Sequence, residues 1–267
     1  MLTHHDETPA PSGAGVSRVW GAPFPTAPAG PPRRRLGPAR FAFEDLEPPD
    51  DDDLVALGGD LSPRTLVAAY AAGYFPMGVG GGGAGPVGWW APQDRGVLVP
   101  ADVHVSRSLA RSMRRFEVRV DTAFDEVVQR CADPSRPGAW ITAEVARAYG
   151  RLHRLGWAHS VEVWADGELA GGLYGVSVGG LFAAESKFHR VTDASKAAVV
   201  ALADLLVADG VRGRLVDVQW RTEHLATLGV QEVPRGRYLR SLAVARELPV
   251  PPVFSARPDR PTDYDGG

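Results

Sequence analysis

The sequence predicts an α+β protein built on a mixed, largely antiparallel sheet. Three observations support this. Strand-like alternation and turn signals follow one another over residues 159–188, helical periodicity precedes and follows that region, and proline-rich segments flank the whole. A chain of 267 residues, 44% of them hydrophobic and 23% charged, can bury a core of this kind.

The composition excludes several classes of protein. The formal net charge is −3, so a polyanion would have to meet a local basic patch. The single cysteine, Cys131, excludes a disulfide framework and a cysteine-rich zinc site. No apolar run reaches the roughly 20 residues of a membrane span, and the polar start of the chain shows no secretory signal. We therefore expect a cytoplasmic monomer with no membrane partner.

Proline-rich segments suggest the domain boundaries. Residues 1–40 carry eight prolines and the run Arg33-Arg34-Arg35 but no apolar period, which predicts a flexible extension. The arginines are interpreted there as solvated linker charge in preference to a polyanion contact. Residues 247–267 are predicted to form a flexible tail. Between these segments we expect a small N-terminal domain over 41–100 and a larger domain over 101–246.

The small domain has one clear helix signal. Ser62 can cap a helix that begins at Pro63 and ends at Gly73. Six glycines within 78–85 lack the Gly-Lys-Ser/Thr ending of a phosphate-binding loop, which favours a mobile surface loop. The tryptophan pair 89–90 follows, either packing one domain on the next or closing over a ligand, and packing is the simpler interpretation.

A helix beginning at His104 is expected to have an apolar and a basic stripe. Leu109, Met113 and Phe116 recur at helical spacing and predict its buried face. The neighbouring stripe is either a contact to a phosphate backbone or an ordinary solvated face. Its members are Arg107, Arg111, Arg114 and Arg115, with Arg119 just beyond.

Two more helices precede the sheet. The first is expected over 122–132, with Cys131 in the core. The second begins at a Thr142 cap and ends at Gly156.

The pattern then changes to strands. Segments 159–164, 168–178 and 181–188 are joined by turn signals at 166–167 and 179–180, which predicts an antiparallel meander.

Helices and one further strand complete the chain. Asp193 can cap a helix over 194–208, a strand follows over 215–220, and helices are expected near 224–228 and 235–245. This order is compatible with N-acyltransferase folds of the acetyltransferase type.

Three polar residues stand out in otherwise apolar strands. Alternation places Asp217 and Gln219 on one face of their strand, and Glu185 ends an apolar run in the strand expected nearby. Burying such groups without partners costs about 1–3 kcal/mol each, so they either hydrogen-bond to structure or line a site. Together they could orient a nucleophilic amine and take its proton.

Many short strings occur in a characteristic order. They are LGGDLSP (57–63), FP (75–76), WWAP (89–92), HVSRS (104–108), WIT (140–142), AHSVEVW (158–164), GGLYG (171–175), ES (185–186), DASK (193–196), DVQ (217–219) and HLATLG (224–229). Together they resemble the bacterial leucyl/phenylalanyl-tRNA–protein transferases over about residues 57–239.

This resemblance implies a small N-terminal domain on an acetyltransferase-like, GNAT-type C-terminal domain. It implies an aminoacyltransferase that moves Leu or Phe from aminoacyl-tRNA to the N-terminal Arg or Lys of an acceptor protein, marking that protein for degradation. Neither a metal nor a coenzyme is expected, because the tRNA ester is already activated.

The resemblance also implies roles for particular residues. Asp217 and Gln219 match the pair that activates the acceptor amine, and Glu185 matches a glutamate that positions the substrate amino groups. Trp140 and Tyr149 match residues near the tRNA 3′ end, where stacking on the terminal adenosine is expected. The remaining matches are Trp90, Leu173 and Phe182 in the aminoacyl and adenosine pocket, and Arg107, Arg111, Arg114 and Arg115 in the tRNA-contacting cluster.

Some positions depart from the family pattern. Lys187 stands where a methionine would face the aminoacyl side chain, Met77 replaces a tryptophan, and Thr222 replaces an asparagine. Lys187 either keeps an apolar stem in the pocket or changes which amino acid is accepted.

Two alternatives to the transferase follow. One is a tRNA-binding protein of the same fold without transfer activity, or with changed aminoacyl specificity, which the presence of Glu185, Asp217 and Gln219 argues against. The other is acetyl-CoA-dependent N-acetylation, for which the phosphate-cradle motif is missing.

Overall fold

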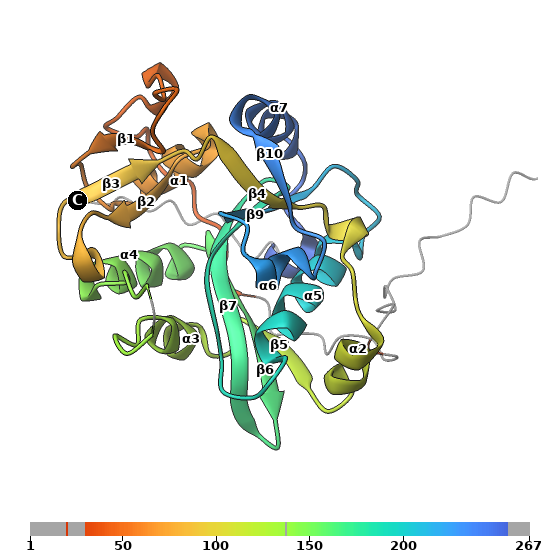
Figure 1. The fold of residues 1–267 in the computed structure, drawn as a ribbon. Coiled ribbons are helices and arrows are strands. Elements are labelled where there is room, and N and C mark those ends of the chain that lie inside the picture. The colour runs from red at the N-terminus through yellow and green to blue at the C-terminus, as the bar shows by residue number, and fades with distance from the viewer. Residues whose placement is uncertain (1–19, 21–29, 137, 256–267) are drawn as a thin grey trace, which may run out of the picture.

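The computed structural model describes Trp20 and residues 30–136 and 138–255. It contains a small sheet at the N-terminal side and a large sheet covered on both faces by helices (Figure 1). This agrees with the predicted α+β class and its small N-terminal domain.

The small sheet is antiparallel, with strand order β1-β3-β2. Its helix, α1, begins at Pro63 after a Ser62 side-chain cap and ends at Gly73, whose φ of 93° is left-handed, as predicted. The elements are β1 (Leu54–Leu57), α1 (Pro63–Ala72), β2 (Phe75–Gly78) and β3 (Val87–Trp90).

The large sheet has seven strands in the order β10-β4-β9-β8-β7-β6-β5. Only the β8–β9 pair is parallel, which confirms a mixed, largely antiparallel sheet, and β6, β7 and β8 form the predicted meander. The strands are β4 (Asp94–Leu98), β5 (Glu117–Val120), β6 (Ala158–Ala165), β7 (Glu168–Val178), β8 (Leu181–His189), β9 (Leu215–Gln219) and β10 (Gln231–Pro234).

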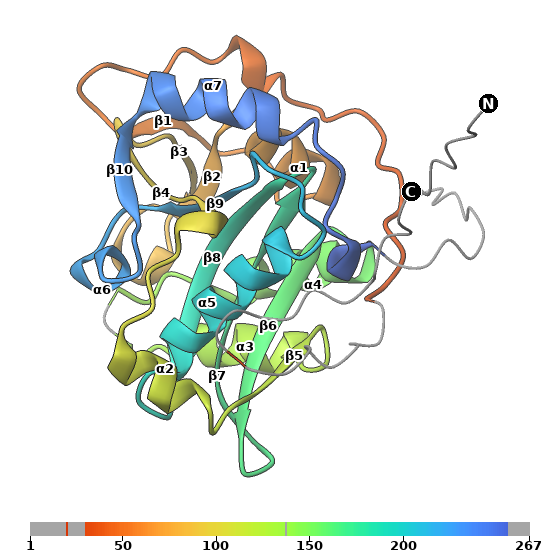
Figure 2. The ribbon, with the colours of Figure 1, turned by 90° about the vertical axis from the view of Figure 1, so that its right-hand side faces the viewer.

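Helices cover both faces of the large sheet and create two cores. Helix α5 packs on one face, whereas α1, α3 and α4 pack on the other (Figure 2). The helices of the large domain are α2 (Arg107–Met113), α3 (Phe124–Cys131), α4 (Ala143–Arg154), α5 (Ala194–Val207), α6 (Glu223–Ala226) and α7 (Arg235–Ala245). Cys131 is buried in the core, as expected.

The domain boundary lies earlier than predicted. Strand β4 pairs with β9 and β10 and so belongs to the large sheet, which places the boundary before Asp94 and not at residue 100. The sequence pattern does not predict β4, β5 or β10, because strands of four or five residues are too short to show clear alternation.

The predicted flexible extension is anchored in its last part. The Arg33 guanidinium lies 4.3 Å from the Trp157 ring centroid and donates to the carbonyl oxygens of Gly156 and Ser177 at 3.2 and 2.8 Å. Burial lowers the pKa of Arg33 to about 10. The interpretation of this arginine as solvated linker charge is therefore wrong. Residues 1–19 and 21–29 lie outside the described residues.

The first residues of the predicted tail also pack on the core. Phe254 is 1% exposed, and its ring lies 4.5 Å from that of His159 and 5.3 Å from that of Phe182. The chain therefore contributes to the core as far as this residue, and 256–267 lie outside the described residues.

Two local predictions need correction. Asp193 does not cap α5 through its side chain, which instead accepts a hydrogen bond from the Ser112 hydroxyl at 2.6 Å. Within the glycine-rich connection, Gly83 is buried, and a side chain there would meet the Trp140 main chain, so this part of the loop packs on the large domain. In the part of the chain that the structure describes, no helix is both long and apolar enough to span a bilayer.

Candidate active site

The polar residues singled out in the sequence lie on neighbouring strands at the centre of the large sheet. Strand β9 carries Asp217 and Gln219, and it is flanked by β8, which carries Glu185, and by β4, which carries Arg95. The structure therefore brings together the three predicted residues and adds an arginine that sequence reasoning missed.

Asp217 is fully buried and its carboxylate is saturated with donors. Arg95 donates from Nε and Nη2 to the two carboxylate oxygens at 2.8 and 2.7 Å. The Tyr238 hydroxyl donates at 2.9 Å, and so does the main-chain N–H of Gln219. A carboxylate that accepts four hydrogen bonds has little capacity left to accept a substrate proton.

Arg95 is 1% exposed and is held on several sides. Its guanidinium lies 4.7 Å from the Phe75 ring centroid and 4.6 Å from that of Tyr238, and it donates to the Gly73 carbonyl at 3.2 Å. Burial alone would lower its pKa, but the Asp217 carboxylate more than offsets this effect and raises it. The only sequence signal is an arginine two residues before the apolar run Val97 to Val99.

The backbone at Gln219 breaks the strand alternation. Its φ is 62°, a left-handed value that is uncommon for a residue other than glycine, and the β4–β9 register shifts between Gly96 and Val97. The Gln219 N–H donates to Asp217, which holds this conformation in place. The regular alternation on which the prediction of a shared face for Asp217 and Gln219 rests is therefore interrupted at Gln219.

The Gln219 side chain points toward Glu185 and a neighbouring cavity. In one orientation of the amide, Gln219 Nε2 donates to Glu185 Oε1 at 3.4 Å. Rotated by 180°, the amide nitrogen donates to the carbonyl oxygens of Ala184 and Val218 at 2.8 and 3.0 Å. The rotated form satisfies both carbonyls and turns the amide oxygen toward Glu185, where a protonated carboxyl would donate to it.

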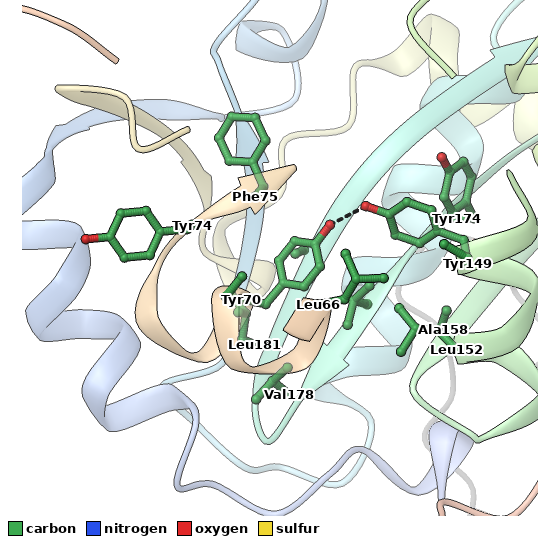
Figure 3. Close-up of a cluster of buried hydrophobic side chains, with 14 of the residues drawn as sticks. Leu66, Tyr70, Tyr74, Phe75, Tyr149, Leu152, Ala158, Tyr174, Val178 and Leu181 are labelled. Atoms are coloured by element: carbon green, nitrogen blue, oxygen red, sulfur yellow. Dashed lines mark hydrogen bonds between the residues drawn. The ribbon is translucent and has the colours of Figure 1, made fainter. Parts of the chain in front are cut away.

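Glu185 is supported by buried tyrosines. The Tyr149 hydroxyl donates to Oε2 at 2.8 Å and is itself hydrogen-bonded to Tyr70 (Figure 3). Burial raises the pKa of Glu185 from 4.5 to about 7, although hydrogen bonds from Tyr70 and Tyr149 oppose the rise. Both the protonated and the ionised form of this carboxyl are therefore accessible near neutral pH.

Tyr149 has a different environment from the one expected. It is 0% exposed, and its ring lies 5.3 Å from the Tyr174 ring in an edge contact. Its faces are covered by protein, so the expected stacking on an adenosine is wrong for this residue. Its hydroxyl instead fixes the position of Glu185.

A cavity of about 60 Å³ lies beside Glu185 and Gln219. Its wall is mostly apolar, and Lys187 is the cationic side chain that lines it. Burial lowers the pKa of Lys187, and repulsion from Arg136 lowers it further. Among the described residues, no carboxylate lies within ion-pair distance of its ammonium group. The apolar lining residues include Leu173, Val199, Leu202, Val216 and Leu225.

The other predicted pocket residues are placed unequally. Leu173 lines the cavity. Phe182 is buried in the core against Phe254 and does not line the cavity, which differs from its expected place in the aminoacyl and adenosine pocket. Trp90 is partly buried, donates to the Met77 carbonyl at 3.1 Å and packs edge-on against Trp220. Trp140 is also partly buried and packs against the core.

The predicted tRNA-contacting arginines form an exposed patch on and just after α2. Arg115 donates to the Thr192 carbonyl at 3.3 Å, and the patch faces solvent elsewhere. Within the described ranges, no group of three or more His, Cys, Asp and Glu side chains could hold a metal ion. The patch comprises Arg107, Arg111, Arg114 and Arg115.

Fold and site together define a two-domain α+β enzyme with a polar centre beside an apolar cavity. The family model described as leucyl/phenylalanyl-tRNA protein transferase matches residues 97–243, and the model of its N-terminal domain matches residues 59–93. The chain belongs to this family.

Individual relatives agree with the family match. A leucyl/phenylalanyl-tRNA–protein transferase of Anaeromyxobacter sp. (strain Fw109-5) is 49% identical over 79% of this chain and 90% of its own length. One from Aromatoleum aromaticum is 50% identical over 73% of this chain and 81% of its own. Among solved structures, a conserved protein of unknown function from Bacteroides thetaiotaomicron covers 56% of this chain and 55% of its own at 11% identity, with a TM-score of 0.34 too low to assign a fold.

The ion pair between Arg95 and Asp217 yields a stability prediction. Arg95→Leu leaves a buried carboxylate without its charge partner and should lower the free energy of unfolding by about 3–5 kcal/mol. The exposed Arg130, paired with Glu126 at 3.2 Å, is the matched control, and Arg130→Leu should cost only about 0.5 kcal/mol. Urea denaturation measures both. Equal effects of the two variants would contradict a dominant role for the buried pair.

Proposed function

We propose that this chain transfers Leu or Phe from aminoacyl-tRNA to the N-terminal Arg or Lys of an acceptor protein and so marks that protein for degradation. The observation that carries this proposal is the placement of Gln219 and Glu185 at the edge of an apolar cavity. Family membership supports the aminoacyl transfer, because the relatives are named leucyl/phenylalanyl-tRNA–protein transferases. We also propose that the chain acts as a monomer in the cytoplasm.

The geometry supports a separate task for each polar residue. Asp217 is a positioning residue, because its carboxylate is occupied by Arg95, Tyr238 and the Gln219 N–H. Gln219 presents its amide oxygen to the acceptor amine. Glu185 binds the same amine and takes its proton, for which a pKa of about 7 is suitable.

The reaction needs no change of oxidation state. The acceptor α-amine attacks the ester carbonyl, a C–N bond forms, and the C–O bond to the tRNA ribose breaks. The proton that leaves the amine passes to Glu185 and from there to the departing 3′-oxygen of the ribose, so that Glu185 returns to its ionised form. Holding the amine and the ester together supplies much of the rate enhancement. The apolar cavity receives the aminoacyl side chain, with Leu173 in its wall.

The surrounding surface supports the tRNA. The arginine patch on α2 contacts the phosphate backbone of the acceptor stem. Trp90 and Trp140 are both partly buried and supply the indole rings that stack on the terminal adenosine.

The first test is transfer itself. Labelled Leu and Phe, each supplied on its tRNA, should be transferred to a peptide that begins with Arg but not to one that begins with Glu. Gln219→Ala should lower kcat at least about 100-fold, in the range seen when one stabilising polar group is removed. Gln231→Ala, on the exposed edge strand, should leave kcat unchanged. Transfer of an acetyl group from acetyl-CoA, or binding of tRNA without any transfer, would contradict the proposal.

Glu185 predicts the pH dependence. Activity should rise as the pH passes about 7, because only the ionised carboxylate takes the proton, and Glu185→Gln should remove this inflection. Because burial opposes ionisation, the folded state holds this proton more tightly than the unfolded chain. The free energy of unfolding should therefore fall as the pH rises from 4.5 to about 7. A wild-type rate profile identical to that of Glu185→Gln would contradict the role.

Lys187 predicts the aminoacyl preference. A buried ammonium next to an apolar aminoacyl side chain is unfavourable, so Lys187→Met should raise kcat/KM for Leu-tRNA and Phe-tRNA by about 10-fold. Lys196→Met, outside the cavity, is the control. An unchanged kcat/KM in Lys187→Met would show that the lysine stem alone lines the pocket and its ammonium lies clear of the substrate.

A further inference from the structure

A wide groove lies on the surface between α1, α4 and the anchored N-terminal segment 34–37. Its volume is about 1010 Å³, and none of the residues proposed for catalysis lines it. The three elements come from distant parts of the sequence and are neighbours only in the fold (Figure 2). The groove is lined by five arginines, namely Arg34, Arg35, Arg64, Arg151 and Arg154.

Contacts of Arg33 and of the Arg34 main chain hold the N-terminal segment beside the groove. The Arg33 guanidinium packs on the Trp157 ring, and the main-chain N–H and carbonyl of Arg34 both hydrogen-bond to the large domain. Its N–H donates to the Leu155 carbonyl at 3.0 Å, and its own carbonyl accepts from the Trp157 indole at 2.9 Å. Arg34 and Arg35 therefore line the groove as part of an anchored segment.

The positive charge of the groove is poorly balanced. Only two acidic residues line it, Asp60 and Glu144, against five arginines. Asp60 is engaged by the Ser62 N–H at 2.9 Å and the Thr65 hydroxyl at 2.7 Å. Within the described residues, none of the five arginines forms an ion pair. In a chain of net charge −3, this concentration of guanidinium groups is a local exception.

Most of these guanidinium groups face solvent. Arg35, Arg64, Arg151 and Arg154 are exposed, and Arg147 continues the stripe along α4 one turn before Arg151. Exposed arginines without ion pairs, lining one concave surface, are suited to bidentate contacts with successive phosphate groups.

We propose that this groove binds the phosphodiester backbone of the tRNA as a second contact, separate from the arginine patch on α2. The inference rests on the proposed function, because tRNA is the polyanion that the reaction supplies. The patch on α2 lies on the other side of the molecule from α4 in both ribbon views (Figures 1 and 2). The groove and the α2 patch are therefore two separate basic surfaces. In this proposal they contact different parts of a large RNA.

The acceptor protein is the less suitable occupant. Its reacting end is proposed to carry a free amino group and an Arg or Lys side chain, which five arginines would repel. An acidic protein segment is a second polyanion that could bind there, and the experiment distinguishes it from tRNA.

The experiment compares two triple variants that change the net charge equally. The groove variant is Arg35→Gln, Arg64→Gln and Arg151→Gln, at exposed positions without ion pairs. The control variant changes three exposed arginines outside the groove, Arg212, Arg237 and Arg240, to Gln. Binding of uncharged tRNA is measured over a range of salt concentrations, together with transfer from aminoacyl-tRNA and from aminoacyl-adenosine.

The groove variant should weaken tRNA binding at least about 10-fold at low salt. The slope of log K against log[salt] should become shallower by about 1 for each phosphate group that the arginines no longer neutralise. Transfer from aminoacyl-adenosine, which carries no phosphate backbone, should stay unchanged in both variants and show that the catalytic centre is intact. Binding of an acidic peptide should not depend on the groove.

Three outcomes would overturn the inference. These are an unchanged tRNA affinity, an equal weakening in the control variant, or a loss of acidic-peptide binding with tRNA binding retained. Failure of the proposed function is a different result, because a wild-type protein that transfers neither amino acid still allows the tRNA binding of the two variants to be compared.

Discussion

The buried ion pair between Arg95 and Asp217 is the constraint on which the rest of the centre depends. It joins β4 to β9 across the middle of the large sheet, reaches the end of α1 through the Gly73 carbonyl, and is closed by Tyr238 on α7. Two charges removed from water are tolerated here because the Asp217 carboxylate accepts four hydrogen bonds and each guanidinium nitrogen of Arg95 donates one. The pair therefore ties both domains to one strand, the strand that carries Gln219.

The second consequence of this pair is conformational. Asp217 accepts the Gln219 N–H and stabilises a left-handed backbone at a residue that is not glycine. A strained conformation of this kind persists only where its surroundings determine it. The Gln219 side chain faces Glu185. The charges of the pair also act on Glu185 with opposite signs, because Asp217 raises its pKa and Arg95 lowers it.

A polar chain on the other side of Glu185 links it to the small domain. Tyr70 on α1 bonds to Tyr149 on α4, and Tyr149 bonds to Glu185. These hydroxyls have no access to water, and the pKa values of both tyrosines lie well above the ordinary value because of burial. The Glu185 carboxyl is thus positioned from the N-terminal domain as well as from the sheet.

The sequence by itself determined the class of fold, the meander, the capped helices around Ser62 and Thr142, and the identities of Glu185, Asp217 and Gln219. These predictions rest on local signals: capping chemistry, turn residues and polar side chains in apolar strands. The tertiary structure alone decided the partners of those residues, because Arg95 lies 122 positions from Asp217 and nothing local connects them. It also decided that Tyr149 and Phe182 are buried and that Arg33 is anchored, since burial depends on which distant elements pack together.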